Sequence, residues 1–293
     1  LSRLVNRRRL AAPFAGARRL VMVTTVMTTR LAEYQPVVRG LGGKTVYRVA
    51  ADFDLCPQER GSDGSDPFTA ALREVDAVVT QTDTQACWAL ELLGRESVGI
   101  SPSVRIPEKR EPAEKDTILW VGQCYALKRP WAFLELARAF PDERFVMIAP
   151  DVGAPYFFDA IADSAKSLAN LELIESVPYS EIQHHFDQAK VFVNTSLVEG
   201  FPNTFHQAAI ARTPVLSLSW NTGDYLTATG IGQCAHGDMN VLIEQLRGLL
   251  EDSTLRTTMG ETARCRVEQY NDVRIVVEDW KRLFRSLVGD DTA

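Results

Sequence analysis

Five apolar runs of strand length, separated by helical patterns, occupy residues 117–219 and leave few possible folds for this part of the chain. The runs are TILWVG at 117–122, RFVMIA at 144–149, LELIE at 171–175, KVFVNT at 190–195 and PVLSLS at 214–219. The helical patterns cover residues 130–140, 155–169, 179–188 and 203–212, with further helices expected at about 238–251, 254–269 and 272–288. Continuously apolar strands that alternate with amphipathic helices are typical of a parallel sheet covered on both faces. This half of the chain therefore predicts a doubly wound α/β domain.

The first third of the chain predicts part of another α/β domain. Strands are expected at 44–51, 76–80 and 97–100, with a helix over residues 82–93. The charged, proline-punctuated stretch 105–116 has no apolar periodicity and predicts a linker. We therefore expect an N-terminal domain over residues 1–110 and a C-terminal domain over residues 111–293, with the final helix, about 272–288, crossing back to the first domain.

Charge is distributed unevenly along the chain. The net charge is −6 at pH 7, yet residues 1–30 carry seven arginines and no acidic residue. This segment is either a solvated helix face or a peripheral contact with an anionic membrane surface, and both interpretations stay open. The acidic remainder would repel a phosphate backbone, so nucleic acid is not expected as a partner. No apolar run approaches the roughly 20 residues that span a bilayer, and five dispersed cysteines fit reduced thiols, so we expect a cytoplasmic protein, with peripheral contact at the inner membrane face as the alternative.

The loop after the strand at 117–122 reads GQCYALKRP and carries a basic pair before a helix. Gly122 would let the backbone turn sharply away from the strand. Lys128 and Arg129 come directly before Pro130, which suits the first position of a helix. A cation there can reach an anion held over the sheet edge, although a surface lysine is the alternative interpretation. Ligands of open parallel sheets bind at this edge.

The stretch VEGFPNTFHQ, residues 198–207, joins another apolar strand to a helix. We expect the unpaired carboxylate of Glu199 to point into the crevice at the sheet edge, with Gly200 leaving room for a ligand. Asn203 or Thr204 would cap the helix, whose N-terminal N–H groups attract phosphate. Gln207 would lie two turns along, on about the same face as Glu199. A carboxylate is a poor ligand for phosphate and a good one for hydroxyl groups, so the arrangement favours an anion and a polyol side by side.

These two loops carry a resemblance to a known family. The sequence EGFPNTFHQ, followed by AAIARTPVLS, resembles the Glu-x7-Glu signature of retaining GT-B glycosyltransferases, in particular their family 4. The segment ILWVGQCYALKRPWAFLELARAFPDERFVMIA is similar to that family's strand–loop–helix–strand with a basic diphosphate pair. The resemblance covers about residues 115–270 and extends more weakly through KTVYRVAADFD and AVVTQTDTQ. It implies a GT-B-like fold with a partial, Rossmann-like N-terminal domain.

The resemblance implies a role for each matching residue. Lys128 would neutralise the donor diphosphate and Glu199 would bind hydroxyls of the donor hexose; these two are the candidate catalytic residues. Gln207 would stand where the family holds the ribose with an acid, and Gln123 where it usually has an arginine, with Arg129 as a possible substitute for that missing charge. The full candidate donor-binding set is Gly122, Gln123, Arg129, Val177, Tyr179, Gly200, Phe201, Asn203, Thr204 and Gln207, in which Val177 and Tyr179 flank the segment expected against the nucleobase.

The activity implied is transfer of a sugar from a nucleotide-diphosphate sugar to a glycan or lipid-linked acceptor, with retention of anomeric configuration. No metal and no cofactor are expected, and a role in cell-envelope polysaccharide biosynthesis would fit. The family's N-terminal glycine-rich loop is not found, so we expect an incomplete acceptor domain. A non-catalytic nucleotide-sugar-binding module or assembly partner is the alternative, since Gln123 and Gln207 replace charged residues; a sugar-nucleotide epimerase would need acid and base groups that the sequence does not identify.

Some polar residues have two interpretations. Asp52 and Asp54 follow a strand, where they would either contact the acceptor or cap the next turn. His206 lies next to Gln207 on the same expected helix. We expect it to have a packing role in preference to a catalytic one. The four histidines have no metal-ligand spacing, so no metal site is predicted.

Overall fold

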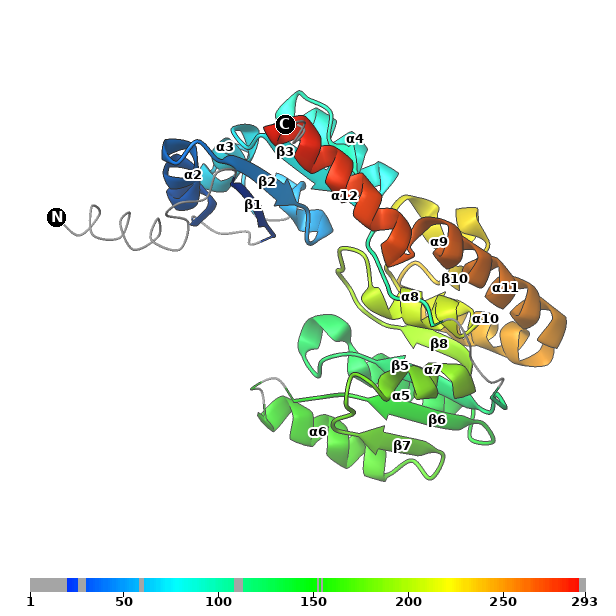
Figure 1. Cartoon of the computed structure of the whole chain (residues 1–293). Helices are drawn as coiled ribbons and strands as arrows, with labels where there is room; N and C mark the ends of the chain where they lie inside the picture. Colours follow the sequence, from blue (N-terminus) through cyan, green and yellow to red (C-terminus); the bar gives the residue numbers. More distant parts are fainter. Residues whose placement is uncertain are drawn as a thin grey trace. The chain divides into compact units, whose positions relative to one another are not determined.

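The computed structural model describes residues 20–25, 30–57, 61–107, 113–151, 153 and 155–289 (Figure 1). The chain divides into two compact units. Unit 1 comprises Leu1–Ser103 and Val273–Ala293, and unit 2 comprises Val104–Asp272. The division therefore falls a few residues before the predicted boundary at 110/111, and the last helix is part of unit 1. Most of the arginine-rich segment 1–30, and residues 108–112 of the predicted linker, lie outside the described residues.

Unit 2 is built on a six-stranded parallel sheet with the order β10-β9-β8-β5-β6-β7. The strands are β5 (Thr117–Val121), β6 (Arg144–Ile148), β7 (Leu171–Ile174), β8 (Ala189–Asn194), β9 (Val215–Ser217) and β10 (Gly232–Cys234). The first five correspond to the five apolar runs, and β10 was not predicted. From β5 the chain runs outward through β6 and β7, then returns to β8 on the other side of β5. This reversal puts the topological switch point between β5 and β8.

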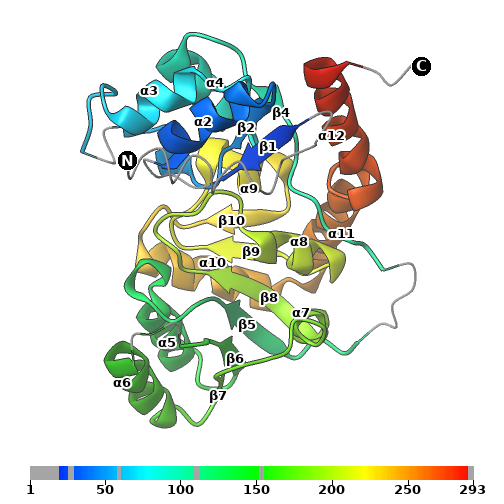
Figure 2. The ribbon, with the colours of Figure 1, turned by 60° about the vertical axis from the view of Figure 1, so that its left-hand side comes forward.

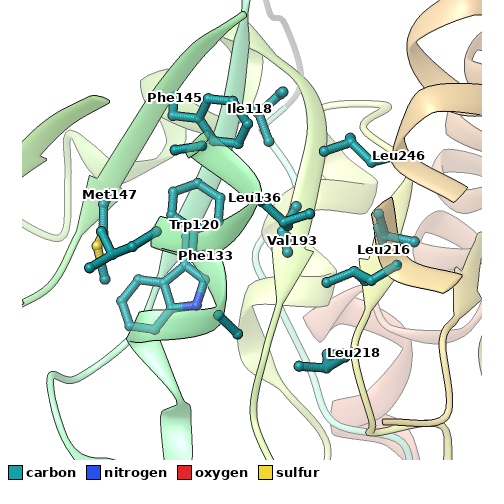
Figure 3. Close-up of a cluster of buried hydrophobic side chains, with 14 of the residues drawn as sticks. Ile118, Trp120, Phe133, Leu136, Phe145, Met147, Val193, Leu216, Leu218 and Leu246 are labelled. Atoms are coloured by element: carbon teal, nitrogen blue, oxygen red, sulfur yellow. The ribbon is translucent and has the colours of Figure 1, made fainter. Parts of the chain in front are cut away.

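Helices cover both faces of this sheet, as its continuously apolar strands require (Figure 2). One face is packed by α5 (Pro130–Ala139), α6 (Pro155–Lys166) and α10 (Met239–Glu251); the other by α7 (Ile182–Gln188), α8 (Asn203–Ile210), α9 (Tyr225–Thr229) and α11 (Ser253–Tyr270). Alternate residues of β5 serve the two faces, since Ile118 and Trp120 join the first core and Leu119 joins the second. Figure 3 shows the first core, where strand side chains meet Phe133 of α5 and Leu246 of α10.

Unit 1 holds a four-stranded parallel sheet in the order β1-β2-β3-β4. The strands are β1 (Val21–Thr24), β2 (Lys44–Arg48), β3 (Ala77–Thr80) and β4 (Val98–Gly99). One face packs against α2 (Arg30–Gly40), α3 (Pro67–Arg73) and α4 (Asp83–Leu93), and the other against α12 (Val273–Val288). Val276 and Leu283 of α12 are buried against Val46 and Val79 of the sheet. The predicted α/β class with parallel sheets is confirmed, whereas β1, α2 and α3 were not predicted.

The two aspartates after β2 serve local structure. They lie in the short 3-10 helix η2 (Asp52–Asp54). Asp54 Oδ2 accepts hydrogen bonds from the N–H groups of Ala50 and Ala51 and from the Tyr47 hydroxyl. Asp52 Oδ1 accepts one from Gln85 Nε2 at 2.8 Å. Of the two interpretations left open by the sequence, these contacts favour capping of the turn.

Two features are absent from the described part of the chain. Within it, no helix combines the length and the apolarity that a bilayer span requires. Within the same residues, no group of three or more His, Cys, Asp or Glu side chains is arranged to hold a metal ion.

Candidate functional site

The two loops identified from the sequence follow neighbouring strands and are bonded to each other. Residues 122–129 follow β5 and residues 195–202 follow β8, so both loops lie at the carboxyl edge, on the two sides of the switch point. Leu197 N–H donates to the Leu127 carbonyl at 2.9 Å, and Thr195 Oγ1 donates to the Lys128 carbonyl at 2.6 Å. Open α/β sheets bind ligands at this place, because the loops diverge there and leave a crevice.

Lys128 and Glu199, one from each loop, form an ion pair. Lys128 Nζ donates to Glu199 Oε1, and the two side chains are only 17% and 15% exposed. The expectation of an unpaired Glu199 is therefore wrong, because the tied loops hold the lysine within reach of the carboxylate. The pair brings the two candidate catalytic residues together. One Lys128 N–H is engaged by Glu199, and an ammonium has three.

Thr195 connects the two loops and was missed by the sequence analysis. Its side chain is fully buried, and its hydroxyl accepts a hydrogen bond from Trp120 Nε1 at 2.8 Å while donating to the Lys128 carbonyl. Its own carbonyl accepts from Arg129 Nε at 2.8 Å. Thr195 thus sets the position of the backbone that carries the basic pair. The available signal was a threonine placed directly after a buried apolar strand.

Arg129 is engaged by protein oxygens. Its Nη2 donates to Ser219 Oγ beyond β9, so its guanidinium joins the loops after β5, β8 and β9. Both acceptors are neutral, and burial lowers the pKa of the guanidinium from its ordinary value. Arg129 therefore holds the loops at this edge together, and this structural role does not depend on contact with a ligand.

Three of the four described non-glycine residues with a left-handed backbone lie in loops that follow strands, whereas the fourth, Arg212, precedes β9. Arg129, Asp224 and His236 adopt left-handed φ values of 48°, 54° and 49°, and they follow β5, β9 and β10 respectively. Non-glycine residues in this region cost roughly 1–3 kcal/mol each, and such residues cluster where a ligand site needs an unusual backbone path.

Gly122 has a role different from the predicted one. Its φ does not lie in the left-handed region, so the predicted sharp turn does not require glycine. A Cβ at this position would lie 3.0 Å from Cη2 of the Trp120 ring. Glycine leaves room for this close approach, because the indole that binds Thr195 packs against the loop backbone.

The N-terminus of α8 follows the Glu199 turn directly. Pro202 occupies the N-cap position with an extended backbone, and no side chain caps the helix. The expectation that Asn203 or Thr204 caps it is wrong, because the helix begins at Asn203 and both residues lie within its first turn. The first N–H groups of α8 therefore lack a side-chain cap, which is the condition that lets a helix N-terminus accept an anion.

The aromatic residues behind the turn make it rigid. Phe201 stacks on His206 with ring centroids 4.9 Å apart and packs edge-on against Tyr225. His206 is 2% exposed, and burial lowers its pKa to about 4, so it is neutral at pH 7. Its Nε2 has no hydrogen-bond partner. These contacts favour the packing role expected for His206.

The remaining candidates lie in varied surroundings. Gly200 is buried and Gln123 is exposed. Gln207 is 8% exposed, and its backbone carbonyl accepts from Gln183 Nε2 at 2.9 Å. Val177 packs at the margin of the second core, and Tyr179 is 82% exposed. Tyr179 precedes α7, which begins at Ile182 and not at 179 as predicted.

The chain is similar in sequence to a family of known proteins. The sequence profile described as "Glycosyl transferases group 1" matches residues 105–266, which is more than half of the chain. The alpha-monoglucosyldiacylglycerol synthase of Acholeplasma laidlawii is 22% identical over 139 residues, an alignment that covers 47% of this chain and 35% of the synthase.

Solved structures share the fold at low sequence identity. S. aureus TarM in complex with fondaparinux, alpha-GlcNAc-glycerol and UDP has a TM-score of 0.71 at 16% identity, covering 90% of this chain and 55% of TarM. Anabaena HepE in complex with UDP and glucose has a TM-score of 0.76 at 14% identity, covering 91% of this chain and 78% of HepE. The chain thus spans about a third of the synthase and about half of TarM. With a profile match over residues 105–266, the chain belongs to the glycosyl transferases group 1 family.

Proposed function

We propose that unit 2 binds a nucleotide-diphosphate sugar between loops 122–129 and 195–202, and that the protein transfers the sugar to a glycan or lipid-linked acceptor with retention of anomeric configuration. The observation that carries this proposal is the Lys128–Glu199 pair at the switch point of a parallel sheet. Family membership supports it. So do the ligands of similar proteins, since TarM was solved with UDP and HepE with UDP and glucose.

In this proposal the diphosphate is held by cationic and dipolar groups. Lys128 keeps two N–H donors beyond the one used by Glu199, and the uncapped N-terminus of α8 offers backbone N–H groups. Both features stabilise negative charge on a departing diphosphate as the sugar gains oxocarbenium character. Metal independence is part of the proposal, with these groups supplying the stabilisation.

Glu199 orients the sugar. Oε1 accepts from Lys128, and the carboxylate retains the capacity to accept hydrogen bonds from sugar hydroxyls at Oε2. The lysine also fixes the position of the carboxylate, which favours one orientation of the hexose. Gln207 would contact the ribose as a neutral group, worth ~1 kcal/mol where a carboxylate would give ~2. Val177 and the exposed Tyr179 would lie along the base.

In the proposed chemical step, the anomeric carbon keeps its configuration. The bond between the anomeric carbon and the diphosphate oxygen breaks, and the acceptor oxygen forms a bond to that carbon from the same face. The proton of the acceptor hydroxyl passes to a phosphate oxygen of the leaving diphosphate. The protein supplies position and charge, and no protein nucleophile is needed.

Turnover of UDP-, GDP- and ADP-sugars by the full chain, with glycan and lipid acceptors, tests the proposal. We expect turnover with one donor class, a product whose anomeric configuration by NMR equals that of the donor, and activity that persists in EDTA. The Glu199→Ala variant should lose at least tenfold in kcat/KM. Near-normal activity of that variant would remove Glu199 from the mechanism, and an inverted product would refute retention.

A non-catalytic nucleotide-sugar-binding module is the second candidate, because Gln123 and Gln207 are neutral where the family resemblance implies charge. Calorimetry with the same donors separates the two. Donor binding without transfer or hydrolysis, with all acceptors supplied, would favour the module over the enzyme.

A further inference from the structure

Arg48 occupies the carboxyl edge of the sheet in unit 1. It is the last residue of β2, which lies between β1 and β3, and its side chain is half-buried. This edge is where loops of an open parallel sheet diverge and ligands bind. Gln81 follows the end of the adjacent strand β3, so both side chains belong to the same edge.

The arginine is held by a preorganised neutral partner. Arg48 Nη2 donates to Gln81 Oε1 at 2.7 Å, and Gln81 Nε2 donates to the Val49 carbonyl at 2.6 Å. The backbone N–H of Gln81 donates to Gln85 Oε1 at 2.9 Å. Both ends of the Gln81 amide are therefore fixed, and they fix one corner of the guanidinium.

The charge of Arg48 is not neutralised within the described residues. None of the described carboxylates forms an ion pair with it, and burial lowers the pKa of its guanidinium. Asp54 is engaged by Tyr47 and two backbone N–H groups, and Asp52 by Gln85. Asp83, at the start of α4, is exposed.

A partly desolvated cation with a neutral partner is unfavourable in the empty protein, since buried charge is normally paired. A guanidinium has five N–H donors in a planar fork that matches the oxygens of phosphate and carboxylate. One of its hydrogen bonds is made to Gln81, which leaves most of the fork for a ligand. The arrangement at this edge thus lacks one component, an anion.

We propose that Arg48, positioned by Gln81, binds a phosphate or carboxylate group carried by the acceptor. The assignment to the acceptor rests on the function proposed above. The anion subsite itself depends only on the geometry of unit 1. The acceptor class is then an anionic one, such as a sugar or polyol bearing a phosphate monoester, in preference to a neutral glycan.

Calorimetry on the full chain, with glycerol 3-phosphate, inorganic phosphate and glycerol as probes at low salt, tests this. We expect glycerol 3-phosphate and inorganic phosphate to bind and glycerol not to bind. If the subsite recognises an acceptor, glycerol 3-phosphate should bind more tightly than inorganic phosphate. Arg48→Met should weaken phosphate binding at least tenfold. Gln81→Glu should do the same, because the new carboxylate would pair with Arg48, and it also removes the donor to the Val49 carbonyl. Arg39→Met, at an exposed arginine 3.6 Å from Glu74, is the matched control and should bind as the wild type does.

Two further measurements separate this inference from the donor site. Arg48→Met should leave UDP affinity unchanged, and Lys128→Met should leave glycerol 3-phosphate affinity unchanged. Arg48→Met should also keep or raise the urea midpoint of unfolding, since it removes an unpaired cation, whereas a structural arginine would lower it. Equal phosphate affinity in wild type and Arg48→Met, or no phosphate binding by the wild type at millimolar concentration, overturns the subsite even if UDP binds.

Discussion

Lys128 Nζ donates a hydrogen bond to Glu199 Oε1 across the switch point of the unit 2 sheet, although 71 positions separate the two residues in the chain. The contact exists because β5 and β8 are adjacent and because their loops are tied by the Thr195 and Leu197 hydrogen bonds. The pair assembles a cation and a carboxylate before any ligand arrives. In the proposed function this is the preorganised charge that a sugar diphosphate meets.

The first prediction concerns this ion pair. Lys128→Met should reduce kcat by about 10²–10³, since removal of one preorganised donor from a developing oxyanion typically has this effect. Glu199→Gln should reduce kcat/KM by weakening the sugar contact. The loss of kcat/KM in the double variant should be smaller than the product of the losses in the two single variants, because each residue also orients the other. Steady-state kinetics of the three variants measures this, and strictly multiplicative losses would show that the pair does not act as a unit.

The second prediction concerns Thr195. Thr195→Val leaves the Trp120 N–H and the Lys128 carbonyl without their buried partner, which should destabilise the protein by about 1–3 kcal/mol. It should also weaken nucleotide-sugar binding, because the backbone of Lys128 is released. Thr195→Ser should restore both properties.

Thr117→Val is the matched control for Thr195. Thr117 is a buried threonine at the amino end of β5, and its hydroxyl donates to the Gln188 carbonyl at 3.1 Å. Its replacement should lower the urea midpoint while donor affinity stays unchanged. If both valine variants lose affinity equally, Thr195 supports the fold without positioning the site.

The third prediction concerns Gly122. Gly122→Ala puts a Cβ about 3.0 Å from the Trp120 ring, so the indole or the loop must shift slightly, which we expect to weaken the hydrogen bond to Thr195. Overpacking of this kind typically costs about 1–3 kcal/mol. Gly248→Ala, within α10 where a Cβ meets nothing within 4 Å, should instead stabilise by about 0.5–1 kcal/mol. Urea unfolding followed by Trp fluorescence distinguishes them; two variants of equal stability would contradict the steric argument.

The fourth prediction concerns pH. Burial lowers the folded-state pKa of His206 to about 4, against 6.5 for an unperturbed histidine. Between these values the unfolded chain binds a proton that the folded protein does not, so stability falls as pH falls from 6.5 towards 4. The loss attributable to His206 is about 3 kcal/mol across that window. His206→Phe, which keeps a ring against Phe201, should flatten the dependence.

Urea midpoints between pH 4.5 and 7.5 give this measurement. His236→Gln is the control, because His236 is exposed and its replacement should leave the slope unchanged. A slope that persists in His206→Phe would assign the pH dependence to other groups.

The architecture of unit 2 follows from local sequence patterns. Its five apolar runs specified β5 to β9; four of these strands are buried on both faces and carry continuous apolar runs, whereas the edge strand β7 is only partly buried. The placement of the two loops was also predictable, since Lys128 and Glu199 each follow a strand and the carboxyl ends of parallel strands lie at one edge of the sheet. The three-residue strand β10 was not predicted, because a short run with one glycine carries almost no periodic signal.

The contacts between these parts depend on long-range packing that the sequence patterns do not show. Strand order is a long-range property, so no local pattern could show that β5 and β8 are neighbours and that Glu199 is therefore paired. For the same reason Thr195 and Trp120 looked like ordinary strand residues, although together they set the backbone of Lys128. The helix start at Asn203 and the packing of Gly122 against Trp120 likewise depend on distances that the sequence does not contain. Local preferences of the chain specify elements and their faces, and the packing of those elements selects which side chains become partners.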